Sequence, residues 1–271
     1  MLLKKNVLPI FIVGIVAISC HRNAITGRSQ LSIVPESEMQ SLALTQYKEF
    51  INTNKVVTAS NKDAEMVKRI GNRIANAITK YYTDKGLANQ LSGYKWEFNL
   101  VESKEVNAWC MPGGKVVVYT GLLPYTQNET ALAIVLGHEI THAVVGHGRE
   151  RMSQQLVAQG LGTIGGAALS GNSQAVNIFN QLYAPTAQVG VLLPNSRKQE
   201  SEADHYGLIF AAIAGYNPAE AVSFWQRMAA ASGQKPPVWL SDHPADEQRI
   251  KDIQRLLPEA ETYYHPSTTK P

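Results

Sequence analysis

Apolar residues recur at helical spacing in two stretches of the N-terminal third of the chain. Residues 35–50 and 62–82 carry apolar side chains three or four positions apart, and in the second stretch these include Ile70, Ile74 and Ile78. This spacing places the apolar side chains on one face of a helix. We therefore predict two amphipathic helices that serve as scaffold.

The period changes to two after these helices. Trp96, Phe98 and Leu100 alternate with polar residues, which is the pattern of a half-buried strand. Residues 106–111 and 115–120 are two further β-like runs on either side of a Pro-Gly-Gly turn, and this arrangement indicates a hairpin. The pattern predicts a small antiparallel sheet.

The edge of such a sheet can bind an extended peptide through main-chain hydrogen bonds. Asn107 and Ala108 are the candidate substrate-binding residues at that edge. An ordinary hairpin without a substrate explains these two residues equally well.

The run from Ala131 to Leu136 is apolar on every side, which predicts a helix buried in the protein. Thr126 and Glu129 have the spacing of a capping box that would begin this helix. Glycines at the other end, near residues 146–148, are expected to terminate it.

Further helices are predicted along the C-terminal half. They cover about residues 150–170, a stretch that begins at Asn195 or Ser196, residues 218–230, and a last helix after Pro244, whereas residues 176–193 are apolar with scattered polar residues. The first of these is rich in glycine, and the sequence leaves open whether it moves as a lid or packs closely against another helix. Because helices outnumber strands, the predicted fold class is α+β, mainly α.

Composition narrows the classes of function. The chain has 271 residues, a formal net charge of +3 and 44% hydrophobic residues, which is typical of a globular protein. It lacks both a basic cluster with aromatic residues and a Gly-rich phosphate loop, so nucleic acid is excluded as a partner. We expect one folded domain over residues 35–258 and a disordered tail over residues 259–271.

The N-terminus has the pattern of a secretory signal. Two lysines precede an apolar stretch at residues 7–18, which is shorter than the roughly 20 residues of a membrane-spanning helix. The sequence that ends at Cys20 resembles the bacterial lipobox, in which this cysteine is acylated after cleavage. Residues 1–19 are therefore expected to be a lipoprotein signal peptide and residues 20–34 a lipid-anchored, extended tether. An uncleaved membrane anchor is the alternative. If Cys20 carries lipid, Cys110 has no partner within the chain for a disulfide; a disulfide between the two would tie the folded body to the N-terminal segment.

The predicted buried helix carries the sequence His-Glu-Ile-Thr-His at residues 138–142. Residues four apart lie about 40° apart around a helix, so His138 and His142 can both face one zinc ion. Glu139 is offset by about 100° and can reach a water on the metal instead. His147 is excluded as a third ligand, because five residues correspond to about 140°.

The helix that begins at Ser196 carries carboxylates in its first turns. Glu200 and Asp204 share a face, which suits a third zinc ligand and a partner that orients a ligating histidine. Glu202 points away, and its charge is explained by the helix dipole. His243 lies in a loop before the last helix, where an ordinary surface histidine is the alternative to a functional one.

These elements resemble, in this order, the gluzincin metallopeptidases of family forty-eight, which include the CAAX prenyl protease, HtpX, BepA and LoiP. The resemblance rests on His-Glu-x-x-His at residues 138–142, Glu-x-x-Ala-Asp at 200–204 and Asp-His-Pro at 242–244, and it extends from about Thr26 to Ile250. It implies a zincin-like metalloprotease fold with the small sheet beside the histidine-bearing helix.

The resemblance also implies the roles of the residues. One zinc ion per chain would be bound by His138, His142 and Glu200, with Glu139 as the general base. Asp204 would support the site from behind the ligands. His243 would be a catalytic residue near the metal, where it either stabilises the transition state or caps the zinc in a resting form.

The function predicted from this resemblance is that of a zinc-dependent metalloendopeptidase in the bacterial cell envelope. The nearest form is the single-domain, lipid-anchored LoiP-like enzyme, which faces the periplasm from the outer membrane. The implied substrates are misfolded or unassembled envelope proteins, and the oligomeric state stays open. The alternative is an envelope chaperone or assembly factor whose zinc site is structural or closed, since His243 would supply a fourth ligand.

Overall fold

The computed structural model describes residues 20–160, 171–183, 196–231, 237, 239–240 and 243–266. The predicted signal peptide, the glycine-rich stretch at 161–170 and the last five residues of the predicted tail lie outside this part of the chain. Among the described residues, no helix combines the length and the apolar character needed to cross a membrane.

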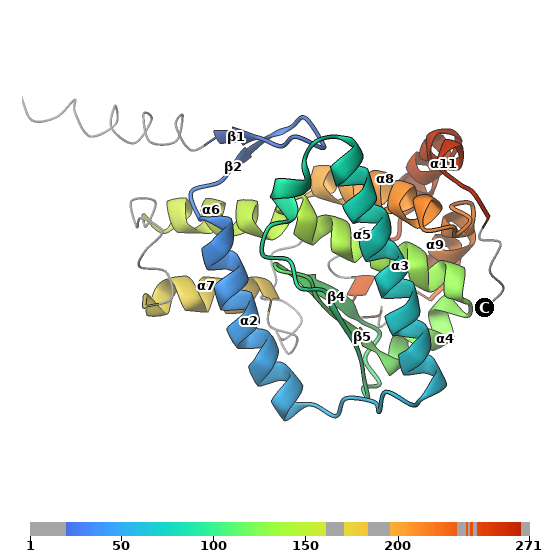
Figure 1. The fold of residues 1–271 in the computed structure, drawn as a ribbon, viewed down its shortest axis with the longest axis horizontal. Helices are drawn as coiled ribbons and strands as arrows, with labels where there is room; N and C mark the ends of the chain where they lie inside the picture. The colour runs from blue at the N-terminus through green and yellow to red at the C-terminus, as the bar shows by residue number, and fades with distance from the viewer. Residues whose placement is uncertain are drawn as a thin grey trace, which may run out of the picture.

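The described part of the chain is mainly helical, so the predicted fold class is confirmed (Figure 1). The helices at 35–50, 62–82, 196 onward and 218–230 are found close to their predicted positions. The α-helices are α2 (Glu36–Thr53), α3 (Lys62–Asp84), α4 (Leu123–Thr126), α5 (Glu129–Val144), α6 (His147–Ala158), α7 (Ser173–Tyr183), α8 (Arg197–Ile213), α9 (Glu220–Ala230) and α11 (Glu247–Thr262).

A three-stranded sheet packs against α5. Its strands are β3 (Glu97–Val101), β4 (Ala108–Met111) and β5 (Lys115–Tyr119), in the order β3-β5-β4. The pairing of β4 with β5 is antiparallel, as predicted, but β3 pairs with β5 in parallel. The prediction of a wholly antiparallel sheet is therefore wrong for one pairing, because the second strand of the hairpin, not the first, lies beside β3.

Helix α5 is the centre of the fold. Every residue from Ala131 to Val144 is buried. The helix contacts α3, α8, α9 and β4, and Figure 1 shows it between the sheet and α8. The prediction of a buried helix is confirmed. Its start differs, since Asn128 caps it by accepting a hydrogen bond from the Ala131 N–H, while Thr126 belongs to α4.

Helices α5 and α8 cross at two glycines. A Cβ atom at Gly137 would lie 2.6 Å from the Gly207 carbonyl oxygen, and one at Gly207 would lie 2.8 Å from the His138 nitrogen. The two backbones can come this close only because neither residue has a side chain. The crossing places the first histidine of α5 directly beside the carboxylate-bearing turns of α8.

The N-terminal segment is packed onto the body of the protein. β1 (Cys20–Arg22) pairs antiparallel with β2 (Ser29–Leu31). The Asn23 side chain donates to the Val145 carbonyl oxygen at 2.9 Å, and the Tyr206 hydroxyl donates to the Ile25 carbonyl oxygen at 2.7 Å. Residues 20–31 are therefore a docked hairpin rather than the extended tether that was expected.

At the other end, α11 continues to Thr262, past the expected domain boundary at residue 258.

Replacing Gly207 with Ala tests the helix crossing. The added methyl group has no space between the two backbones, so we expect Gly207→Ala to lower the free energy of unfolding by about 1–3 kcal/mol. Urea denaturation measures this change. Ser201→Ala, at an exposed position of the same helix, should leave the stability within about 0.5 kcal/mol of the unaltered protein. Equal stability of both variants would contradict a backbone contact at the crossing.

Candidate metal centre

Two histidines from α5 point into one space, as their spacing predicts. The Nε2 atoms of His138 and His142 lie 3.0 Å apart, and both side chains are buried. Glu200 comes from the first turns of α8, whose capping box of Ser196 and Gln199 is formed as predicted. Its Oε1 lies 3.2 Å from His142 Nε2, and its Oε2 lies 3.5 Å from His138 Nε2.

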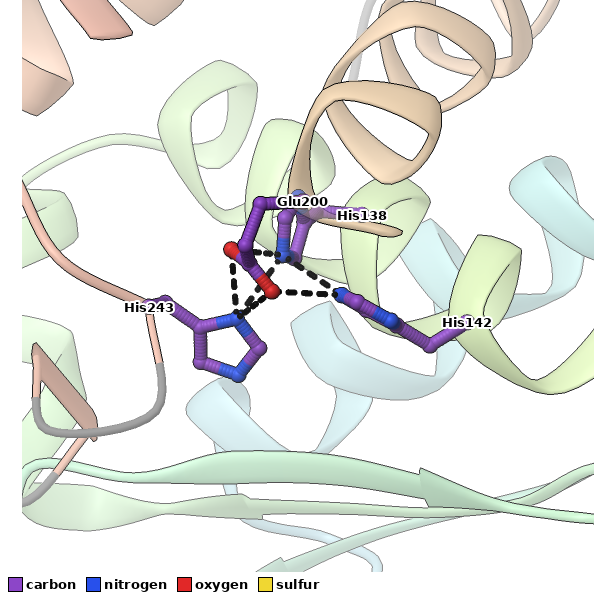
Figure 2. Close-up of side chains that lie close together, drawn as sticks. All are labelled: His138, His142, Glu200 and His243. Atoms are coloured by element: carbon purple, nitrogen blue, oxygen red, sulfur yellow. Dashed lines mark hydrogen bonds and ion pairs between the residues drawn. The ribbon is translucent and has the colours of Figure 1, made fainter. Parts of the chain in front are cut away.

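His243 completes a group of four buried side chains. Its Nδ1 lies 3.0 Å from His138 Nε2 and 3.0 Å from Glu200 Oε2. Figure 2 shows all four side chains converging from α5, α8 and the loop before α11. One ligand atom from each residue, His138, His142, Glu200 and His243, lies within 4.8 Å of the others.

The geometry of this group fits a zinc ion. Tetrahedral zinc with ligand distances of about 2.0–2.1 Å holds neighbouring donor atoms roughly 3.3 Å apart. The separations that involve His138 or Glu200 are 3.0–3.5 Å, and all four ligand atoms lie within 4.8 Å of one another. Imidazole nitrogens and a carboxylate oxygen are ligands that zinc prefers. Nitrogen atoms that face one another without a shared proton also repel, unless a cation lies between them.

Glu139 lies beside this group but outside it. Its side chain is buried, and its Oε1 accepts a hydrogen bond from Trp239 Nε1 at 2.8 Å. The same oxygen is 3.4 Å from His243 Nε2. The one-residue offset from His138 thus produces the predicted separation between ligands and a neighbouring carboxylate.

Asp204 lies behind the first histidine. Its Oδ1 accepts a hydrogen bond from His138 Nδ1 at 2.9 Å, which leaves Nε2 of that ring free to face the other ligands. Both oxygens of Asp204 also accept from Arg249, at 2.9 and 2.8 Å. The same guanidinium lies 2.9 Å from Glu200 Oε2 and packs over the Trp225 ring at 3.5 Å from its centre.

The charges of this cluster shift the pKa values of its members. Burial alone lowers the pKa of His138, but the charges and hydrogen bonds of Glu200 and Asp204 outweigh it and raise that pKa to about 9. Burial raises the pKa of Glu200, whereas the charges of His243, Arg249 and His138 lower it well below its usual range. Burial raises the pKa of Asp204 as well, but the charge of Arg249 and the hydrogen bond from His138 outweigh it and lower that pKa, so Glu200 and Asp204 both stay ionised in the interior.

A profile described as Peptidase family M48 matches residues 61–257, which is most of the chain and includes the four converging side chains. The chain belongs to this family. The resemblance inferred from the sequence is thereby confirmed at the level of the family, together with its zincin-like fold and its use of zinc.

Three relatives show how far the likeness extends. The mitochondrial metalloendopeptidase OMA1 of Schizosaccharomyces pombe is 37% identical over 173 residues, which cover 63% of this chain and 49% of that protein. The beta-barrel assembly-enhancing protease of Yersinia pestis is 30% identical over 162 residues, or 58% of this chain and 33% of that protein. Metalloprotease YcaL of Escherichia coli is 28% identical over 219 residues, or 75% of this chain and 83% of that protein. The chain spans about half the length of the OMA1 relatives it matches.

His147, which sequence reasoning excluded as a zinc ligand, is not one of the converging residues but contacts one of them. Helix α5 ends at Val144, Gly146 has a left-handed φ of 77°, and His147 begins α6. The ring therefore turns back towards α5, and its Nδ1 lies 2.8 Å from His142 Nδ1.

Glu202 likewise has specific partners, so the helix dipole does not fully explain it. Its Oε2 accepts from His147 Nε2 at 2.8 Å, and its Oε1 accepts from Arg28 Nε at 2.7 Å. Hydrogen bonds from these two residues outweigh burial and lower the pKa of Glu202. Glu202 points away from Glu200, as predicted, but towards a second set of side chains that no short motif reveals.

The predicted substrate-binding residues lie at the outer edge of the sheet. β4 is the edge strand, and the Tyr119 N–H donates to the Asn107 carbonyl oxygen at 3.0 Å. Because hydrogen-bonded pairs alternate along an antiparallel ladder, the N–H and C=O groups of Ala108 face away from β5. The predicted lipidation residue, Cys20, is exposed at the start of β1.

We expect the positive charge of Arg249 to offset most of the negative charge of the buried carboxylates of Glu200 and Asp204. Arg249→Met keeps much of the packing on Trp225 but removes the guanidinium charge that contacts both Glu200 and Asp204. We expect a loss of about 3–5 kcal/mol in the free energy of unfolding of the metal-free protein, and a smaller loss when zinc is bound. Urea denaturation with and without a chelator measures both values.

Arg255→Met is the matched control, because Arg255 lies on the same helix with a largely exposed side chain that pairs with Asp252. It should change stability by less than about 1 kcal/mol. A similar effect of the two substitutions would show that Arg249 does not carry the charge balance of the site.

Proposed function

We propose that this chain is a zinc-dependent endopeptidase of the bacterial cell envelope that hydrolyses peptide bonds of misfolded or unassembled envelope proteins. One observation carries the proposal: a buried carboxylate, Glu139, lies beside a zinc-fitting group of side chains without being part of it. A site that only stabilises the fold needs the ligands but has no use for that second carboxylate.

The zinc ligands are His138 and His142 from α5 and Glu200 from α8. When bound there, zinc supplies a water of lowered pKa and polarises the scissile carbonyl group. Asp204 holds the ring of His138 by its Nδ1, and Arg249 in turn fixes Asp204.

Glu139 is the general base. The N–H of Trp239 fixes one carboxylate oxygen, so the other oxygen can take a proton from the attacking water and later deliver it to the leaving amine. His243 Nε2 lies 3.4 Å from the fixed oxygen, which places this ring where it can donate to the oxyanion that develops on the substrate.

The substrate lies along β4 as an added strand. The main-chain groups of Ala108 on this edge strand face away from β5 and can pair with an extended peptide once the residues that bury Ala108 move aside. β4 also packs against the helix that carries the histidines. Main-chain pairing of this kind gives affinity with little dependence on sequence, which suits unfolded substrates.

The envelope location is proposed from the sequence and from one group of relatives. The lipobox-like sequence ends at Cys20, which is exposed and available for acylation. Two relatives come from bacteria, the beta-barrel assembly-enhancing protease of Yersinia pestis and metalloprotease YcaL of Escherichia coli. The OMA1 relatives are mitochondrial, so the family alone does not decide the location.

A second candidate function is that of an envelope chaperone or assembly factor with a closed zinc site. It is favoured by the position of His243, whose Nδ1 lies among the other three ligand atoms. Four protein ligands are typical of structural zinc, whereas three ligands leave a position for water.

Removal of the base tests the proposed enzyme. The purified full chain should cleave an unfolded protein such as reduced casein, and Glu139→Gln should lower the rate by about 10²–10⁴-fold while zinc content stays at one per chain. Gel electrophoresis and metal analysis measure the two quantities. Glu200→Ala should instead lose zinc, and undiminished cleavage by Glu139→Gln would remove Glu139 from the mechanism.

Removal of His243 separates the two candidate functions. If this ring stabilises the oxyanion, His243→Ala should keep zinc and cleave about 10²–10³-fold more slowly. An increase in cleavage would show instead that His243 is a cap. If neither the unaltered protein nor His243→Ala cleaves while both hold zinc, the chaperone or assembly role is favoured.

A further inference from the structure

Four side chains form a continuous path from the N-terminal hairpin to the zinc site. Arg28 donates to Glu202 through Nε at 2.7 Å and Nη2 at 3.1 Å. Glu202 accepts from His147 Nε2 at 2.8 Å, and His147 Nδ1 lies 2.8 Å from His142 Nδ1. The histidine in the middle of this path is fully buried, with a relative exposure of 0%.

The hydrogen-bond partners along this path determine which nitrogen atoms of the two histidines carry protons. An ionised carboxylate can only accept, so the nitrogen of His147 that faces Glu202 carries a proton. A neutral imidazole has one such proton, and Nδ1 of His147 is therefore an acceptor. The Nδ1 of His142 must then donate, which leaves the lone pair of its Nε2 facing the other ligands.

The two zinc-ligating histidines of α5 are thus supported in different ways. For His138, the partner of Nδ1 is a carboxylate, that of Asp204. For His142, the partner is a second imidazole, and the carboxylate is one step further away on Glu202. In the zinc-bound protein, both arrangements hold a proton on Nδ1 and leave the lone pair of Nε2 to the metal.

Arg28 holds the far end of the path. It forms paired hydrogen bonds with Glu150 of α6, at 2.5 and 2.7 Å, as well as with Glu202 of α8. Such two-pronged contacts fix the plane of each carboxylate. Arg28 belongs to the hairpin formed by β1 and β2 and lies outside residues 61–257, which the family profile matches.

We propose that His147 is a positioning residue that fixes the tautomer and orientation of His142, and that Glu202 and Arg28 hold it in place. The inference rests on the proposed zinc site. It makes the N-terminal hairpin a part of that site, because its Arg28 orients the carboxylate that orients His147.

Nitrogen-15 NMR of the unaltered, zinc-loaded full chain with labelled histidines tests the proton positions directly. We expect His147 to show a protonated Nε2 and an unprotonated Nδ1 that accepts from the slowly exchanging Nδ1–H of His142. A protonated Nδ1 on His147, or a ring of His142 bound to zinc through Nδ1, would overturn the proposal.

Zinc affinity, measured by competition with a chromophoric chelator, tests the consequence. His147→Phe should bind zinc about 10–100-fold more weakly. His147→Asn places an amide oxygen near the position of Nδ1 and should recover most of that loss. Arg28→Met should weaken binding in the same direction by a smaller factor.

His205→Phe is the matched control, because His205 forms a similar pair at 2.8 Å with Glu259 of α11, a residue outside the path and the zinc site. It should leave zinc affinity unchanged. If the unaltered protein binds no zinc, the proposed function fails. If it binds zinc and a folded His147→Phe binds it equally well, only the positioning role fails, and thermal melting establishes that the variant is folded.

Discussion

The close crossing of α5 and α8 is the constraint on which the rest of the site depends. Two histidines of one helix cannot hold a metal alone, and the third ligand has to come from another element at a fixed distance. Gly137 and Gly207 allow the two backbones to touch, so that one turn of α8 brings Glu200 to the histidines and the next brings Asp204 to the back of His138. The apolar residues that surround α5 keep water out of this region.

The crossing also gathers negative charge in the interior, which has to be compensated. Glu139, Glu200 and Asp204 are all buried, and a buried carboxylate without a partner is strongly unfavourable. Arg249 contacts two of the three, and the indole N–H of Trp239 donates to the remaining one. A bound zinc ion would add two positive charges at the same point, so metal binding and the stability of the fold are linked.

Much of this architecture could be predicted because it is encoded locally. The spacing of His138 and His142, the capping box at Ser196 and the apolar run of α5 depend only on neighbours in the sequence, and all appear in the structure. The parallel pairing of β3 depends on which strand of the hairpin lies beside it. The alternation of apolar and polar residues along β3 does not determine which strand this is. The contacts of His147 depend on the left-handed turn at Gly146, and the hairpin around Arg28 is fixed by residues more than one hundred positions away.

The most direct test of the account is the position of the metal. A crystal structure of the zinc-loaded protein, with anomalous scattering recorded at the zinc edge, would locate the ion without reference to activity. We expect a single strong peak about 2.0–2.2 Å from Nε2 of His138, Nε2 of His142 and a carboxylate oxygen of Glu200, with Glu139 beyond bonding distance. A peak bound through Glu139, or one that lies away from the two histidines, would contradict it.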